Sequence, residues 1–139
     1  MKTRVLVPTL SLLTCLALAA PAAAGTLTGN WTGETSQDLA LLEEPYTTEI
    51  GFSVLRGRIV DVVAEVRMEC GEYEIDDAVV RKSYEPGRGP KVVAGNVGFK
   101  VDGLKFSGHL GASGGSGTAS ARDGACSGNG EWKVKRVHP

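Results

Sequence analysis

The sequence predicts an all-β protein: a small antiparallel meander β-barrel of about eight strands with one disulfide, or alternatively a β-sandwich. Three observations favour this fold class. The strong periodicities have the two-residue period of strands, and no 3.6-residue pattern is sustained long enough for a helix. Turn residues separate these segments at short intervals. All 19 glycines lie after residue 24, many inside strand segments, where they are typical of bends and tight closure.

Residues 1–24 are predicted to be a secretory signal peptide. Lys2 and Arg4 are followed by an almost uninterrupted apolar run over 5–20 and then by the small residues that signal peptidase accepts. The run is too short for a membrane-spanning helix, and lipid attachment at Cys15 is a minor alternative. We therefore expect a secreted or periplasmic protein.

Cleavage after Ala24 leaves 139 minus 24, or 115, residues. That length fits a single β-barrel domain over 25–139, without a transmembrane segment. Cys70 and Cys126 are then an even pair of cysteines in an oxidising compartment, so we predict a disulfide between them. A reactive thiol or metal pair is the alternative, but no histidine cluster supports it.

The clearest strand is 46–54, in which apolar and polar residues alternate. A tight turn near Arg56 and Gly57 joins it to a long strand over 58–70, and the two should form a hairpin. The 58–70 strand must curl or bulge because of its length, and it places Cys70 on the buried face. The chain before this hairpin contains a loop over 36–45, in which 39–42 could form a brief helical turn.

The remaining strands are less regular. Asp102 and Gly103 form a strong hairpin signal before a strand over 104–112. The other expected elements are two short strands at 72–75 and 78–84 around an Asp76–Asp77 turn, a loop at 85–90, and a strand at 91–100. They are followed by a flexible turn at 113–117 and strands at 118–122 and 131–137.

Charge is distributed unevenly along the mature chain. Residues 25–86 contain 13 acidic and 5 basic residues, a net charge of −8, whereas 87–139 contain 3 acidic and 8 basic residues, or +5. The mature total of −3 lacks the basic excess of a nucleic-acid-binding protein. Two interpretations stay open: a polarised surface that steers a charged partner, or favourable pairs between acidic early strands and basic late strands.

No catalytic motif has the context that its chemistry requires. Residues 111–115 match Gly-x-Ser-x-Gly, but this motif works at a strand-to-helix elbow, and here it falls in a predicted hairpin loop. The mature histidines are His109, expected to be exposed on a strand, and His138, next to the end of the chain. We predict no catalytic residues, no metal site and no cofactor.

Two charged clusters could bind ligands. The acidic one could bind calcium or provide an acid and base pair, but it lacks the glycine-punctuated spacing of a calcium loop, which favours a solvated strand edge. The basic one could hold an anionic polymer on the barrel wall, or form an ordinary charged outer face. The acidic cluster comprises Glu69, Glu72, Glu74, Asp76 and Asp77, and the basic cluster Arg122, Lys133, Lys135 and Arg136.

The mature chain resembles the small secreted eight-stranded β-barrel proteins of high-GC bacteria, most of which have no assigned function. This resemblance implies the fold and the disulfide but no active site. The residues that carry it are the opening Gly29, Asn30, Trp31, Thr32 and Gly33; Ile50, Phe52, Val54, Gly57 and Ile59; Cys70; Phe106 and Gly108; Gly117 and Thr118; and Cys126, Gly130, Trp132 and Arg136.

The Gly29-Asn30-Trp31 segment also resembles the Gly-x-Trp of lipocalin-like and avidin-like barrels. In those barrels the tryptophan packs across the closed end. We therefore expect Trp31 and Trp132, from the first and last strands, to plug the core rather than to contact a ligand.

These observations favour a monomeric, non-enzymatic binding protein for a small ligand or a protein partner, with the loops at 36–45 and 85–90 as recognition elements. Two other function classes stay open. One is a structural or envelope-associated surface protein that makes repeated contacts through an edge strand. The other is a small barrel enzyme that uses carboxylates.

Overall fold

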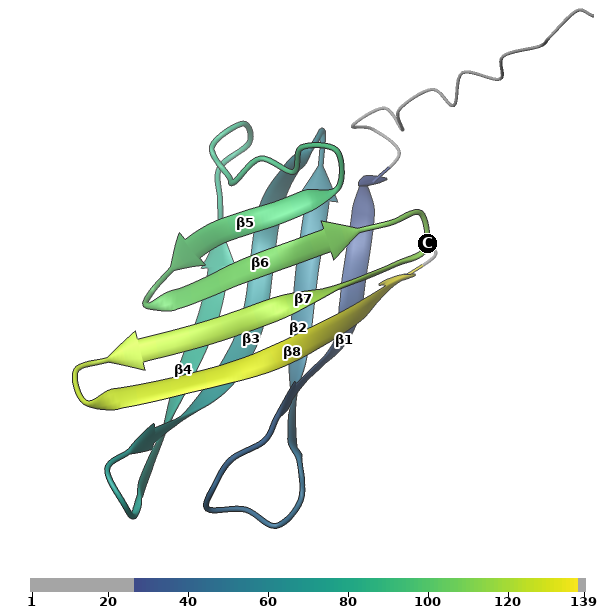
Figure 1. Ribbon diagram of the computed structural model, residues 1–139. Coiled ribbons are helices and arrows are strands. Elements are labelled where there is room, and N and C mark those ends of the chain that lie inside the picture. The colour runs from purple at the N-terminus through teal and green to yellow at the C-terminus, as the bar shows by residue number, and fades with distance from the viewer. Residues whose placement is uncertain (1–26, 138–139) are drawn as a thin grey trace, which may run out of the picture.

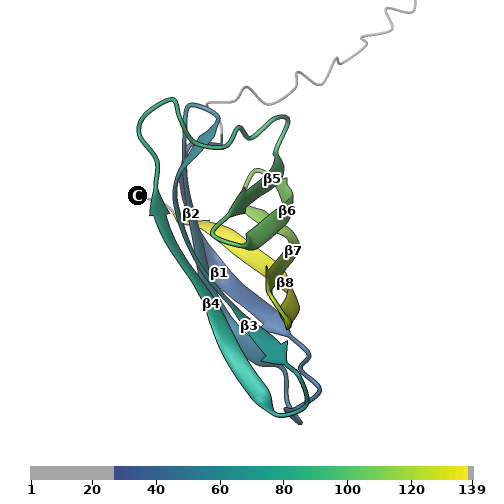
Figure 2. The ribbon, with the colours of Figure 1, turned by 90° about the vertical axis from the view of Figure 1, so that its left-hand side faces the viewer.

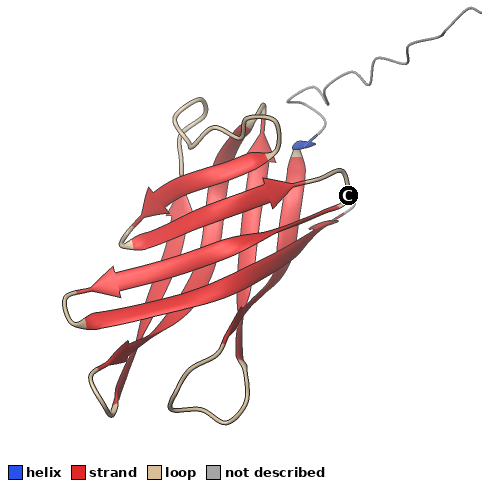
Figure 3. Ribbon diagram, in the orientation of Figure 1, coloured by secondary structure: helices blue, strands red, loops and turns tan. Residues whose placement is uncertain are grey.

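The computed structural model describes residues 27–137, so the predicted signal peptide and its cleavage site lie outside the described residues. Eight strands make up almost all the regular structure (Figure 3). They are β1 (Gly29–Gln37), β2 (Tyr46–Leu55), β3 (Arg58–Cys70), β4 (Glu74–Ser83), β5 (Asn96–Val101), β6 (Leu104–Leu110), β7 (Gly114–Asp123) and β8 (Cys126–Val137).

The predicted fold class is confirmed: the strands form one antiparallel meander in the order β4-β3-β2-β1-β8-β7-β6-β5. The sheet folds into two layers, β1–β4 and β5–β8, whose strands cross at a large angle (Figures 1 and 2). A second pairing, of β3 with β8, closes one side of the ring. Within residues 27–137 no strand pairing joins β4 to β5, so closure is partial.

The Gln37 side chain fills the corner of the sheet at which β3 separates from β2 and turns toward β8. The β2–β3 ladder ends at Ala64, and the β3–β8 ladder begins at Glu69. Between them the Gln37 side chain accepts a hydrogen bond from the Arg67 N–H at 2.8 Å and donates one to the Arg67 carbonyl at 2.9 Å. It also donates to the Asn129 carbonyl at 3.2 Å. A buried amide thus takes the place of a missing strand neighbour.

The Cys70–Cys126 disulfide is confirmed and lies at the same corner. The two cysteines are cross-strand partners in the β3–β8 ladder, with Cα atoms 4.2 Å apart. The bond therefore fastens the two layers where the ring closes.

The predicted hairpin of β2 and β3 is confirmed, as is the turn at Asp102 and Gly103. Both turn residues have positive φ, 47° and 82°, which is the conformation of a two-residue hairpin. The 39–42 segment forms a turn closed by the Leu42 N–H and the Leu39 carbonyl at 3.0 Å, not a helix.

The predicted Asp76–Asp77 turn is wrong, because both residues lie within the continuous strand β4. Eight of the ten residues of β4 are exposed, since it is an edge strand that extends beyond the core. Polar residues can therefore occupy either of its faces, which removes the alternation that would have marked a strand.

The predicted flexible turn at 113–117 is also wrong, since β7 begins at Gly114. Gly108 and Gly117 are cross-strand partners, and a Cβ on Gly117 would lie 2.6 Å from the Trp132 ring. A Cβ on Gly108 would also collide with this ring. The glycines let strands β6 and β7 pass close over the indole. Elsewhere β5 is shorter and β8 longer than expected.

The core lies between the two layers and is centred on aromatic side chains. Trp31 and Trp132 have no exposed surface, and their indole N–H groups donate to the Leu27 and Thr118 carbonyls, each at 3.1 Å. The Phe52 ring lies edge-on to Trp132 and Phe106, at centroid distances of 5.4 and 5.8 Å. These rings fill the space that a ligand would occupy in a hollow barrel.

Thr35 is fully buried, and its hydroxyl has no hydrogen-bond partner among the described residues. A valine has the same shape without the unpaired oxygen. We expect Thr35→Val to raise the free energy of unfolding by about 1 kcal/mol, measured by urea denaturation.

Thr48→Val is the matched control for Thr35→Val. The Thr48 hydroxyl donates to the Glu65 carbonyl at 2.6 Å, so its removal should destabilise the protein. A loss of stability in Thr35→Val as large as that in Thr48→Val would contradict the assignment of an unpaired hydroxyl.

Candidate functional site

The outer face of the β5–β8 layer gathers most of the basic residues of the later half of the chain. Its exposed cations are Lys100, Lys105, Arg122, Lys133 and Lys135. On the outward-pointing positions of these four strands Glu131 is the one carboxylate, so the face has a net charge of 5 minus 1, or +4. We call this surface the basic face.

Small polar side chains occupy the space between these cations. Thr118 lies directly between Ser107 and Glu131 in the register of β6, β7 and β8. In the next row Ser120 lies between Lys105 and Asn129. The face therefore alternates ammonium groups with hydroxyl and amide groups.

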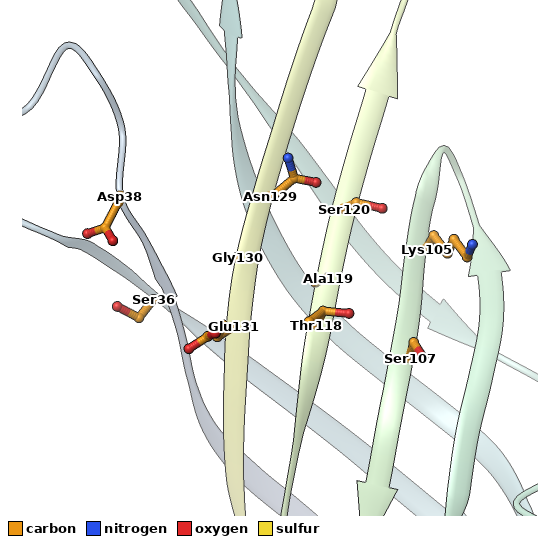
Figure 4. A pocket seen from close by; sticks show the side chains of 10 residues that line it. All are labelled: Ser36, Asp38, Lys105, Ser107, Thr118, Ala119, Ser120, Asn129, Gly130 and Glu131. Carbon is orange, nitrogen blue, oxygen red and sulfur yellow. The ribbon is translucent and has the colours of Figure 1, made fainter.

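A shallow hollow of about 720 Å³ covers these rows (Figure 4). It extends from β6 across β8 to the end of β1, where Ser36 and Asp38 form its far rim. Its lining consists of Ser36, Asp38, Lys105, Ser107, Thr118, Ala119, Ser120, Asn129, Gly130 and Glu131. A second hollow of about 690 Å³ adjoins it through Lys105, Ser120 and Asn129. It adds the cations Lys100 and Arg122 and the carboxylate of Asp102.

A third hollow, of about 870 Å³, lies over the glycine-rich ends of β6 and β7. Its polar lining includes His109, Lys133, Lys135, Ser113 and Ser116, with one carboxylate, that of Glu34 on β1. His109 is exposed, as predicted, and its Nδ1 lies 3.3 Å from the Asn96 side-chain oxygen. The three hollows together run along much of the basic face.

The Gly-x-Ser-x-Gly segment spans the β6–β7 hairpin turn and the first two residues of β7, so the predicted hairpin loop is confirmed only for 111–113. The Gly111 N–H donates to the Gly114 carbonyl at 2.7 Å, and the Ser113 carbonyl accepts from the Arg136 N–H at 2.9 Å. Ser113 and His109 line the same hollow, yet within residues 27–137 no hydrogen bond joins their side chains. The contact between nucleophile and base that a serine hydrolase needs is therefore not present between them.

The basic cluster predicted from sequence is only partly correct. Lys133 and Lys135 lie side by side on the basic face, and Arg122 lies toward its other end. Arg136 does not belong to this face: its guanidinium lies 5.7 Å from the Trp31 ring centre and donates to the Thr28 carbonyl. Lys100 and Lys105 were missed, although the alternation of their strands with buried residues marks them as outward-pointing.

The acidic cluster does not form a metal site. Among the described residues no group of three or more His, Cys, Asp or Glu side chains could hold a metal ion. Asp77 instead forms a salt bridge with Arg67, with Arg67 Nε 2.8 Å from its Oδ1. Glu72 and Glu74 lie exposed at the tip of the β3–β4 hairpin.

A cluster of side chains on β2 and β3 includes Tyr46, Glu65 and Arg67. The Tyr46 hydroxyl donates to the Glu65 carboxylate at 3.1 Å, and the Arg67 guanidinium stacks 3.8 Å from the centre of the Tyr46 ring. Burial raises the pKa of Tyr46 above its ordinary value of 10.0, and the hydrogen bond to Glu65 raises it further. Burial likewise raises the pKa of Tyr84.

The raised pKa of Tyr46 predicts a loss of stability in alkali. The folded protein holds this proton more tightly than the unfolded chain does. The contribution of Tyr46 to the free energy of unfolding is therefore complete below pH 10.0 and is lost as the pH rises through the pKa of the folded state. We expect the free energy of unfolding to fall less steeply above pH 10 in Tyr46→Phe than in the wild type. Urea titrations at a series of pH values measure the difference, and parallel curves would refute it.

The two long loops lie at opposite ends of the molecule (Figure 1). The loop after β1 extends beyond one end of the first layer, while the chain after β4 crosses the other end toward β5. These loops therefore do not form a common recognition surface. The basic face, not the loops or the core, is the best candidate site.

No protein-family model, curated protein or solved structure matches this chain significantly. The chain is an eight-stranded, all-antiparallel β-sheet domain. Within the described residues no helix is long and apolar enough to cross a membrane.

Proposed function

We propose that this chain is a secreted or periplasmic, non-enzymatic binding protein that holds an acidic polysaccharide on its basic face. The observation that carries this proposal is the gathering of five exposed cations on one outer sheet face, separated by rows of hydroxyl and amide groups. The proposed place of action follows from the predicted signal peptide.

The chemistry of the face favours a polysaccharide over a nucleic acid. Lysine and arginine attract carboxylate, sulfate or phosphate groups, and the intervening Ser, Thr and Asn side chains can bind sugar hydroxyls. Single-stranded nucleic acids also require aromatic platforms on which bases stack. Phe99 and Phe106 point to the other side of the layer, toward Phe52 in the core.

The adjoining hollows favour an extended ligand over a compact one. Two of them share Lys105, Ser120 and Asn129, and the third, which is lined by Lys133 and Lys135, lies over the next residues along β7 and β8. The buried aromatic core leaves the barrel interior filled, which argues against a small ligand held inside as in a hollow barrel.

Binding of a carboxylated polysaccharide such as polygalacturonate, followed by calorimetry at two salt concentrations, tests the proposal. We expect binding that weakens as salt rises, because exposed charges are screened. Lys133→Gln combined with Lys135→Gln should weaken binding roughly tenfold, since each exposed ion pair contributes up to about 1 kcal/mol.

Lys82→Gln combined with Lys91→Gln is the matched control, because both lysines are exposed outside the basic face. This pair should bind like the wild type. Equal losses in the two variants, or the absence of binding, would overturn the proposal. Equally tight binding of single-stranded DNA would favour a nucleic acid instead, and turnover of the polymer would refute the non-enzymatic role.

A further inference from the structure

The outer face of the β1–β4 layer has the opposite charge to the basic face. Six carboxylates occupy outward positions on these strands, against Arg58, Arg67 and Arg81, which gives a net charge of 3 minus 6, or −3. The six are Glu34, Glu49, Asp61, Glu65, Glu69 and Asp77. We call this surface the acidic face.

We propose that the acidic face is a docking surface for the basic face of a second copy of this chain. The two layers pack through their inner sides, so the two charged faces point away from each other (Figure 2). Copies can therefore associate front to back, with −3 facing +4. This inference goes beyond polysaccharide binding and does not depend on it.

Each face also carries two like charges directly opposite each other in a strand ladder. Lys100 lies directly opposite Lys105 in the β5–β6 ladder, and Glu34 directly opposite Glu49 in the β1–β2 ladder. Like charges directly opposite each other destabilise a sheet. Lys133 flanks Glu34 on its other side, but the Lys100–Lys105 pair has only Ser120 beside it. A second copy would bring opposite charges to both pairs.

The size of the faces suits a weak contact. Four strands about 4.8 Å apart, each about nine residues long at roughly 3.3 Å per residue, cover about 600 Å². Two such faces bury about 1,200 Å² in total, at the lower end of specific interfaces. Tyr46 lies at the acidic face but is half-buried against Glu65 and Arg67, and the exposed Tyr73 lies at the β3–β4 turn. Neither face therefore has a fully exposed aromatic anchor.

The expected association is therefore reversible and sensitive to salt. At dilute concentration and physiological salt the protein remains the monomer that the sequence predicts. Because a polysaccharide would occupy the same basic face, it should compete with the second copy.

Sedimentation velocity of the purified chain in 20 mM and 300 mM salt tests this inference. We expect the weight-average sedimentation coefficient to rise with protein concentration in 20 mM salt and to stay constant in 300 mM salt. Lys133→Glu with Lys135→Glu, and separately Glu49→Lys with Asp61→Lys, should each abolish the rise. An equimolar mixture of the two variants should restore it, because each then presents the charge that the other lacks.

Glu74→Lys with Asp76→Lys is the control with the same change in net charge. Both residues belong to β4 but alternate with the residues of the acidic face, so association should persist. A wild type that stays monomeric in 20 mM salt, or a mixture that does not associate, would overturn the inference. If a charge-reversed pair does not fold, Lys133→Gln with Lys135→Gln or Glu49→Gln with Asp61→Asn replaces it, with loss of association as the expected result.

The two proposals fail in distinguishable ways. The Glu49→Lys, Asp61→Lys variant keeps its basic face and should still bind polygalacturonate. If this variant loses self-association but still binds the polysaccharide, the acidic face acts in self-association and not in the proposed function. If the wild type does not bind the polymer, the proposed function fails, but the sedimentation result still tests self-association.

Discussion

Replacing Cys70 and Cys126 together with alanine should lower the free energy of unfolding by about 4 kcal/mol. The disulfide joins residues 56 positions apart, so its removal lets the unfolded chain explore many more conformations. This loss is a large share of the stability expected for so small a domain. Urea unfolding followed by tryptophan fluorescence measures it, because both indoles are buried in the core.

Reduction of the wild-type protein is the natural comparison for the alanine variant. Both should lose similar stability, and intact mass should show that reduction adds two hydrogens. An alanine variant as stable as the oxidised wild type would show that the bond does not constrain the unfolded chain.

Replacing Gln37 with methionine should cost about 3 kcal/mol. The side chain is 1% exposed, and methionine has a similar length but none of its hydrogen-bonding atoms. The variant would leave the Arg67 N–H and carbonyl, and the Asn129 carbonyl, without their partner at a buried corner. Each unpaired buried group costs about 1–3 kcal/mol, partly relieved by water. Chemical denaturation measures the difference.

Ser36→Ala is the control for the Gln37 substitution, since Ser36 is the exposed neighbour on the same strand. Its effect should stay within about 0.5 kcal/mol. If Gln37→Met is as stable as the wild type, the corner between β2 and β3 does not depend on the Gln37 amide.

The strands that could be predicted from sequence are those whose alternation is enforced by burial on one side. β3 was predicted with its observed bounds because apolar and charged residues alternate over most of its length, with Val60 and Val63 as exceptions. β4 was divided in two because its middle residues, Asp76 and Asp77, are exposed at an edge of the sheet and need not alternate. Periodicity marks a strand only where the core is near.

The glycines of β7 show a second limit of prediction from sequence. Gly114 and Gly117 look like turn residues to local sequence reasoning, and Gly114 does begin the strand directly after one. Gly117 is required instead by the indole of Trp132, a residue on the next strand. Contacts of this kind depend on register, which a single segment does not reveal.

The candidate site was partly predictable, because burial on one side enforces alternation in β8 as it does in β3. Lys133 and Lys135 alternate with the buried Trp132 and Val134, so their outward positions follow from the sequence. Arg136 has the opposite parity, which already places it on the inner side with Trp132. The contribution of Lys100 and Lys105 depends on the order of strands, because β5 and β6 reach this face only through the meander.

The disulfide corner also links an early strand to a late one. Cys70 ends β3, whereas its partner begins β8, the last strand among the described residues. As the chain is synthesised, Cys70 emerges long before the strand that carries Cys126. In the folded protein the two cysteines meet where β8 pairs with β3, so the native disulfide and the docking of β8 stabilise each other. An alkylating reagent added at intervals during refolding would show whether the thiols are consumed before β8 docks or together with it.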